Sequence, residues 1–274
     1  MMIQQIADLL KQSHCIDISK YDNSFLNKSL QKRMAETSSG SVAAYCDVLE
    51  RNLRERTVFI DSLQISYSVF FRNPLTYAVL ERMVLPSLVL NKKTTVQKEI
   101  RIWSAACAGG QEAYTLAILL EEMKNGVDDQ FRYRIFATDQ SEEQVHAATK
   151  GQFTAAALQS VSLKRAGEWF TRQGDCYQIK AELQKNIAFS QFDLLNDIVS
   201  YPPTSIFGDF DLVVCANLLF YYKNACRNII LRKVNNSLAK NGLLITGEAE
   251  RDIVMRHDFI ELYPHSALFR RNLP

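Results

Sequence analysis

A turn between a predicted strand and a predicted helix carries the residues best suited to bind a small polar ligand. Gly109 and Gly110 let the backbone bend tightly and approach a ligand closely, and Glu112 follows them. A carboxylate in this place also suits the positive end of a helix dipole, which is the structural alternative for Glu112. The chain contains neither G-x-G-x-x-G at this turn nor G-x-x-x-x-G-K-[ST] anywhere. A dinucleotide or nucleoside triphosphate site is therefore disfavoured.

A second carboxylate, Asp139, follows the next apolar segment, Phe136–Thr138. At the end of a second strand it could accept hydrogen bonds from both hydroxyls of a ribose. Its alternative role is to cap a helix that opens near Ser141. Together with Gly109 and Gly110, Asp139 favours a cofactor that contains adenosine but no phosphate, which indicates S-adenosylmethionine.

Composition excludes several other classes of protein. The 274 residues are 47% hydrophobic with a formal net charge of +2, which disfavours a disordered chain or a nucleic-acid-binding protein. No apolar run approaches the ~18 residues of a membrane span, and the N-terminal stretch has no basic residues of a signal peptide. Six scattered cysteines show no metal-like spacing with the four histidines. We expect a cytoplasmic monomer without a metal.

From residue 100 onward, strand and helix patterns alternate, as is typical of an α/β protein with a doubly wound, mostly parallel sheet. Strands are expected at Ile100–Ala106, Tyr133–Thr138, Ile187–Phe192, Asp211–Ala216 and Leu243–Gly247, with a closing hairpin at Glu261–Tyr263 and Ala267–Arg271. Helices are expected at Glu112–Met123, Ser141–Thr149 and Ala225–Leu238. Ligands of such sheets bind at the carboxyl ends of the strands, where Gly109 and Asp139 would lie.

The chain changes character near residue 91. Residues 1–90 have helical periodicity throughout, and Asn91–Thr95 is expected to form a polar linker. Residues 91–274 would form the α/β domain. The stretch 153–186 interrupts the alternation and predicts a small inserted subdomain.

Six ordered motifs make a family resemblance visible. They are Ser66–Arg72 (SYSVFFR), Ile102–Tyr114, Ala137–Asp139, Asp193–Leu195, Asp211–Tyr221 and Asn241–Leu244. The set resembles the CheR family of chemotaxis receptor glutamate methyltransferases and covers nearly the whole chain. The resemblance implies a helical N-terminal domain, then a Rossmann-like S-adenosylmethionine domain with a small inserted subdomain. It also implies methylation of glutamate carboxylates on methyl-accepting chemoreceptors, with S-adenosylhomocysteine as the second product.

The resemblance implies a role for each matched position. The residues that would contact the cofactor are Ser66, Ser68, Arg72, Glu112, Asp139, Asp193, Leu194, Ala216 and Asn217. Arg72 and Tyr221 would line the methyl-transfer site and are the candidate catalytic residues.

Several positions depart from the family pattern. Ser66 and Ser68 stand where Asn and Thr are usual, Asp193 replaces an Asn, and Ala216 replaces an Arg. Two alternatives therefore stay open: a non-catalytic module that binds S-adenosylmethionine or S-adenosylhomocysteine, and a methyltransferase with a different protein substrate.

Receptor docking would use a basic helix near the N-terminus. Lys28, Lys32 and Arg33 lie in a stretch without acidic residues, which by default indicates a solvated helix face. In the resembled family such a helix docks on acidic receptor helices. The stretch Phe170–Tyr177 contains only one glycine, Gly174, so we expect recognition that does not depend on a receptor-tail peptide.

Overall fold

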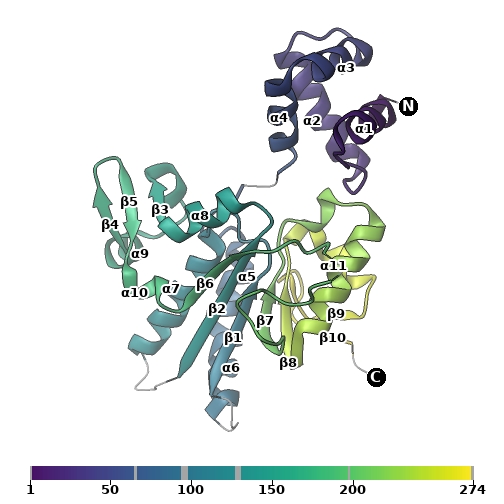
Figure 1. Ribbon diagram of the computed structural model, residues 1–274. Helices are drawn as coiled ribbons and strands as arrows, with labels where there is room; N and C mark the ends of the chain where they lie inside the picture. The colour runs from purple at the N-terminus through teal and green to yellow at the C-terminus, as the bar shows by residue number, and fades with distance from the viewer. Residues whose placement is uncertain (1, 65–66, 94–97, 127–130, 197, 273–274) are drawn as a thin grey trace. The chain divides into compact units, whose positions relative to one another are not determined.

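The computed structural model describes residues 2–64, 67–93, 98–126, 131–196 and 198–272. The chain forms two compact units, coloured along the sequence in Figure 1. The first unit comprises Met1–Ile65 together with Leu218–Asn228. The second comprises Ser66–Asn217 and Ile229–Pro274.

The first unit is helical, as its periodicity predicts. Its elements are α1 (Met2–His14), α2 (Asn23–Glu36), α3 (Val42–Arg51), α4 (Leu53–Ser62) and the short 3-10 helix η3 (Leu219–Tyr221). Side chains of Asp22, Ser41 and Asn52 accept hydrogen bonds from backbone N–H groups in the first turns of α2, α3 and α4. Apolar residues at helical spacing form its core, including Ile6, Leu10, Leu26, Leu30, Leu49 and Phe59.

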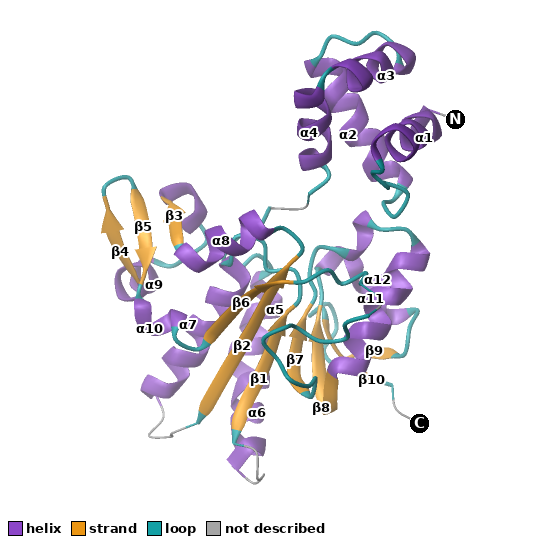
Figure 2. Cartoon of the chain, in the orientation of Figure 1, coloured by secondary structure: helices purple, strands orange, loops and turns teal. Residues whose placement is uncertain are grey.

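A seven-stranded sheet, drawn in orange in Figure 2, organises the second unit. Its strands are β1 (Glu99–Ser104), β2 (Arg132–Asp139), β6 (Ile187–Gln191), β7 (Phe210–Val214), β8 (Leu238–Ile245), β9 (Phe259–Glu261) and β10 (Leu268–Arg271). They are ordered β6-β2-β1-β7-β8-β10-β9. The first five are parallel, and β10 and β9 form an antiparallel edge. The predicted α/β class and closing hairpin are confirmed.

The remaining helices outside the inserted subdomain belong to the second unit, except that α11 begins in the first unit and continues into the second. They are α5 (Pro74–Val79), the π-helix η1 (Leu80–Val84), α6 (Leu85–Lys93), α7 (Gln111–Gly126), α8 (Glu142–Lys150), α11 (Asn224–Ser237), the 3-10 helix η4 (Glu248–Glu250) and α12 (Arg251–Met255). Among the described residues, no helix is long and apolar enough to cross a membrane.

The division between the units falls at residue 65, earlier than the boundary expected at residue 90. Leu80, Val84 and Leu85 on the helices after residue 65 are buried in the same apolar core as Ile100 and Ile102 of β1. Helical periodicity alone does not reveal that these helices pack on the sheet. Of the expected linker, Asn91–Lys93 is instead helical and completes α6, while Thr94 and Thr95 lie outside the described residues.

The expected insertion forms a second, three-stranded sheet with the order β3-β5-β4. Its elements are β3 (Gln152–Thr154), the 3-10 helix η2 (Ala155–Leu158), α9 (Leu163–Trp169), β4 (Phe170–Gln173), β5 (Cys176–Ile179) and α10 (Ala181–Gln184). β4 and β5 make a hairpin whose tip is Gly174-Asp175, because Gln173 pairs with Cys176. Gly174 has φ +62°, the left-handed conformation that such a tight turn needs.

Candidate functional site

The turn between β1 and α7 is built around a glycine that no other residue could replace without a clash. Gly110 has φ +90°, and a Cβ there would lie 2.9 Å from the Cβ of Ala148. Ala108 also has a positive φ, 45°, a strained conformation for a residue with a side chain. The N–H of Cys107 donates to the carbonyl of Thr138 at 2.9 Å, which ties this turn to the end of β2.

Asp139 ends β2 and holds the same turn from the other side. Its Oδ2 accepts from the N–H of Ala108 at 2.9 Å, and its Oδ1 accepts from the N–H of Ser141 at 2.9 Å. The helix cap proper is Ser141, whose side chain accepts from the N–H of Gln144. Asp139 is 7% exposed, and burial raises the pKa of its carboxyl group despite these bonds. A carboxylate has about four acceptor positions in all, so Asp139 could still accept from a ligand hydroxyl.

Glu112 lies in the first turn of α7 and accepts a hydrogen bond from Ser104 Oγ at 2.6 Å. Burial and, to a lesser extent, the nearby Glu250 raise the pKa of Glu112 to about 7, although the hydrogen bond from Ser104 and the charge of Arg72 oppose the shift. The neighbouring Gln111 Oε1 is buried without a hydrogen-bond partner in the structure. A half-buried carboxylate and an unsatisfied acceptor together suit a positively charged ligand that donates hydrogen bonds.

Glu250 is a candidate site residue that sequence reasoning missed. Its side chain is fully buried after β8, and its Oε2 accepts from the N–H of Asn217 at 2.7 Å and of Gly247 at 2.8 Å. Asn217 has φ +60°, and a Cβ on Gly247 would lie 3.0 Å from its side chain. Glu250 thus holds the chain where β7 and β8 end. The spacing Gly247-x-x-Glu250 just after a predicted strand was the available sequence signal.

The remaining cofactor candidates differ in exposure. Ala216 follows β7 and is half-buried against the core. After β6, Leu194 is buried, whereas the Asp193 side chain is exposed and accepts from the N–H of Leu195 at 2.9 Å. Since β6, β2, β1, β7 and β8 are adjacent and parallel, the sheet gathers the candidate residues that follow them at one edge.

Arg72 lies in the second unit, on the segment that precedes α5. Its Nη1 donates to the carbonyl of Tyr67 at 3.3 Å, and its guanidinium lies 5.3 Å from the centre of the Tyr67 ring. Ser68 is half-buried on the same segment, while Ser66 lies outside the described residues. The charge of Arg72 lowers the pKa of Glu112, so the two side chains lie within electrostatic range of each other.

Tyr221 belongs to the first unit, on η3. Its carbonyl accepts from the N–H of Asp22 at 2.8 Å, and its ring packs edge-on against Phe25 with centroids 4.8 Å apart. The joint action of Tyr221 and Arg72 in one methyl-transfer site stays a prediction, since the two residues belong to different units.

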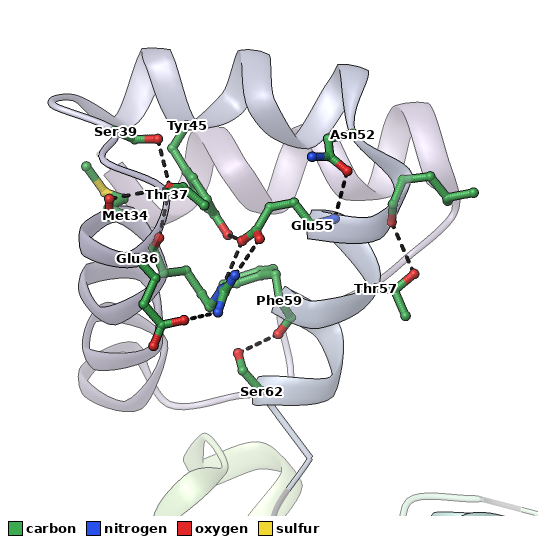
Figure 3. A network of polar contacts seen from close by, with 12 residues as sticks. Met34, Glu36, Thr37, Ser39, Tyr45, Asn52, Glu55, Thr57, Phe59 and Ser62 are labelled. Atoms are coloured by element: carbon green, nitrogen blue, oxygen red, sulfur yellow. Dashed lines mark hydrogen bonds and ion pairs between the residues drawn. The ribbon is translucent and has the colours of Figure 1, made fainter.

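The three basic residues of α2 do not share one environment. Lys28 and Lys32 are exposed, as a docking face requires. The guanidinium of Arg33 instead pairs with Glu55 and Glu36, which are both labelled in Figure 3. The predicted docking role of Arg33 therefore needs correction: its charge is already engaged by an internal partner 22 residues away.

Taken together, the described residues fit a cofactor with a ribose and a positive charge. Asp139 and Glu250 supply buried carboxylates and Glu112 a half-buried one, beside a glycine turn into which a Cβ would not fit. Among the described parts of the chain, no three His, Cys, Asp or Glu residues are grouped as a metal site would need.

Comparison with known proteins gives matches over both units. The family model described as the CheR methyltransferase SAM-binding domain matches residues 66–263, and the CheR methyltransferase all-alpha domain matches residues 1–63. The chain is 28% identical to a chemotaxis protein methyltransferase of Listeria innocua, over 89% of this chain and 87% of that relative. It is 29% identical to chemotaxis protein methyltransferase 1 of Pseudomonas aeruginosa, over 83% of this chain and 80% of that one. A 104.1 kDa protein of Rhodobacter capsulatus is 29% identical over 93% of this chain, which spans only 26% of that relative.

Proposed function

The chain belongs to the CheR methyltransferase family, and we propose that it transfers methyl groups from S-adenosylmethionine to glutamate side chains of chemoreceptors. The products are glutamate methyl esters and S-adenosylhomocysteine. The observation that carries the proposal is the group of buried and half-buried carboxylates around the β1–α7 turn, because a sulfonium cofactor is cationic and stabilises such carboxylates.

In this proposal the second unit holds the cofactor. Asp139 accepts hydrogen bonds from the ribose hydroxyls, and Glu112 with Gln111 Oε1 accepts from the ammonium of the methionine part. Leu194 and Asp193 lie beside the adenine, and Ala216 and Asn217 close the pocket. Bound in this way, S-adenosylmethionine supplies a methyl group on a positively charged sulfur.

The methyl acceptor needs no general base. A glutamate side chain is ionised at pH 7, so its oxygen can attack the methyl carbon directly. The new C–O bond forms as the C–S bond breaks, and the electron pair of that bond stays on sulfur. Arg72 can hold a carboxylate in bidentate fashion, either the substrate's or the cofactor's own, and the hydroxyl of Tyr221 orients the attacking oxygen.

The first unit would bring the receptor to the enzyme. Its helix α2 exposes Lys28 and Lys32 one turn apart, a spacing that suits acidic receptor helices. The order of a helical unit followed by a sheet unit supports this division of work.

The test is transfer of labelled methyl from S-adenosylmethionine to membranes that contain chemoreceptors, followed by treatment with base. Release of labelled methanol identifies a methyl ester and supports the proposal. Arg72→Ala and Tyr221→Phe should lower kcat more than they lower thermal stability. Binding of S-adenosylhomocysteine without any transfer would overturn the proposal in favour of a regulatory module, and label on other proteins alone would contradict the receptor substrate.

A further inference from the structure

An arginine of the inserted subdomain contacts the segment that carries Arg72. Arg165 on α9 lies with its guanidinium carbon 4.7 Å from the centre of the Phe71 ring. Phe71 directly precedes Arg72 and has φ +50°, an unfavourable conformation for an aromatic residue. Such backbone persists only when its surroundings hold it in place.

Helix α7 fixes Phe71 and Arg165 to the same rigid element. The N–H of Phe71 donates to Thr115 Oγ1 at 3.3 Å. Arg165 binds Glu122 in bidentate fashion, with Nε at 2.9 Å from Oε1 and Nη2 at 2.7 Å from Oε2. The same helix begins with Glu112, the candidate cofactor residue. One helix therefore sets the distance between the cofactor site and the backbone that carries Arg72.

Further contacts make Arg165 a junction of several elements. Its Nη2 also lies 2.8 Å from Glu81 of the π-helix η1, a kind of helix insertion that is frequent at functional sites. Trp169 Nε1 donates at 3.4 Å to the same Glu122 carboxylate that Arg165 binds. Phe71 packs edge-on against Tyr77 of α5, with centroids 5.8 Å apart.

The preceding residue couples the same segment to the subdomain. Phe70 is fully buried between Phe153 of β3 and Phe170 of β4, with ring centroids 4.9 Å and 5.5 Å away. Phe70 and Phe71, the two residues before Arg72, thus both pack against the inserted subdomain. None of the candidate cofactor residues lies in that subdomain.

We propose that Arg165 is a positioning residue for Arg72, and that the inserted subdomain acts through Arg165 and Phe71 to hold Arg72 at the cofactor. The inference rests on the proposed function, because it assumes that Arg72 contacts the cofactor. Loss of Arg165 leaves Glu122 largely buried without its main cation and removes the support over the Phe71 ring. Arg72 then samples more conformations, and the affinity for the cofactor falls.

The test is a double-mutant cycle read by calorimetric binding of S-adenosylhomocysteine to the full chain, without any receptor. Arg72→Ala should weaken binding, Arg165→Ala should weaken it about fivefold, and the double variant should bind little worse than Arg72→Ala alone. Arg165→Lys keeps the charge but loses the planar bidentate contact, so its affinity should lie between those of wild type and Arg165→Ala. Phe71→Leu keeps the ion pairs, loses the stacked ring and should also weaken binding.

The control is Arg172→Ala, which removes another arginine of the subdomain. Among the described residues, the Arg172 side chain donates only to the carbonyl of Gly174. Its affinity should equal that of wild type. Additive effects of Arg72→Ala and Arg165→Ala, or unchanged affinity in either single variant, would overturn the inference. A non-additive cycle in a protein that does not methylate receptors would support the inference while the proposed function failed.

Discussion

At the scale of single residues, the surroundings of the candidate site favour the neutral form of its carboxyl groups. Burial raises the pKa values of both Glu112 and Asp139. Hydrogen bonds from Ser104, Ala108 and Ser141 partly oppose these shifts, and so does the charge of Arg72 at Glu112. A site of this kind gains most from a ligand that is positively charged and donates hydrogen bonds. The preference for a cationic ligand distinguishes this site from a turn that binds phosphate.

Asp139 should dominate the contact with the ribose. We expect Asp139→Ala to weaken S-adenosylhomocysteine binding by about tenfold or more, since charged hydrogen bonds to the ligand and to the turn are lost together. Isothermal calorimetry measures the affinity, and circular dichroism checks the fold. Asp139→Asn, which keeps one acceptor oxygen, should bind better than the Ala variant. Unchanged affinity in a folded Asp139→Ala protein would remove this residue from the site.

Glu112 should make cofactor binding depend on pH near neutrality. Its carboxyl group, with a pKa of about 7, is neutral below that pH and negative above it, so affinity for cationic S-adenosylmethionine should rise with pH. We expect binding about tenfold weaker at pH 6 than at pH 8, because one proton must be released on binding. Calorimetry across this range measures the effect. Glu112→Gln should flatten the profile, and an equally steep profile in that variant would assign the titration to another group.

At the scale of elements, helix α2 serves two purposes with neighbouring basic residues. Lys28 and Lys32 point to solvent, whereas Arg33 is 13% exposed and pairs with Glu55 of α4. Tyr45 of α3 donates to the same Glu55 carboxylate at 2.8 Å, so Figure 3 shows three helices joined at one buried acid. Of the basic residues on this helix, Lys28 and Lys32 stay available for the proposed docking, whereas Arg33 has a structural role.

Charge reversal on the exposed face should impair docking and leave the fold intact. Lys28→Glu with Lys32→Glu should weaken association with receptor-containing membranes, and added salt should weaken that of the wild type. Sedimentation with membranes measures binding. Methylation that does not respond to salt would contradict electrostatic docking.

Arg33→Ala provides the contrast within the same helix. It leaves the buried Glu55 carboxylate without its cation and should lower the free energy of unfolding by about 2 kcal/mol. This loss is smaller than that for a fully buried pair, because the Arg33 guanidinium is partly exposed. Urea unfolding followed by circular dichroism measures this loss. If the Arg33→Ala protein is as stable as wild type, the pair of Arg33 and Glu55 does not contribute to folding stability.

The hairpin of β4 and β5 bears on receptor recognition at this scale. Its tip is limited to Gly174 and Asp175, which leaves little backbone for an added peptide. We expect a receptor without its C-terminal tail to be methylated at nearly the intact rate. Initial rates with intact and truncated receptors measure this directly. A large loss on truncation, or micromolar binding of the isolated tail peptide, would show that the tail is used.

At the scale of the whole molecule, a segment from late in the sequence belongs with the N-terminal helices. Tyr21 and Tyr222 form an isolated antiparallel bridge, and their rings stack with centroids 5.4 Å apart. The N–H of Lys223 donates to the carbonyl of Lys20 at 3.0 Å, and Arg227 lies 3.8 Å from Asp22. The candidate catalytic Tyr221 is thereby part of the unit that also carries α2, the helix proposed for docking.

This late segment should be essential for the stability of the helical unit. Tyr222 is 4% exposed, so Tyr222→Ala should lower the free energy of unfolding by about 3 kcal/mol through lost burial and stacking. Tyr222→Phe keeps the stacked ring and should cost much less. Urea denaturation compares the two variants. A Tyr222→Ala protein as stable as wild type would show that the segment only rests against the helices.

Local patterns in the sequence were sufficient for the element types, and they indicate where a candidate site lies. Alternating apolar segments predict the parallel sheet, and the turn chemistry of Gly109-Gly110 and the position of Asp139 after a strand predict the edge at which a ligand would bind. These features depend on a few neighbouring residues and on the regular geometry of strands, so they can be read without knowing the fold.

Tertiary structure alone decided the contacts between residues far apart in the chain. The burial of Arg33 against Glu55, the hold of Glu250 on Asn217, the stacking of Arg165 on Phe71 and the inclusion of Leu218–Asn228 in the helical unit each join distant segments. Periodicity states which face of a helix is apolar, but not which other element covers it. Whether a charge is free for a partner or engaged inside the molecule is set by that packing, and so is the path by which one residue positions another.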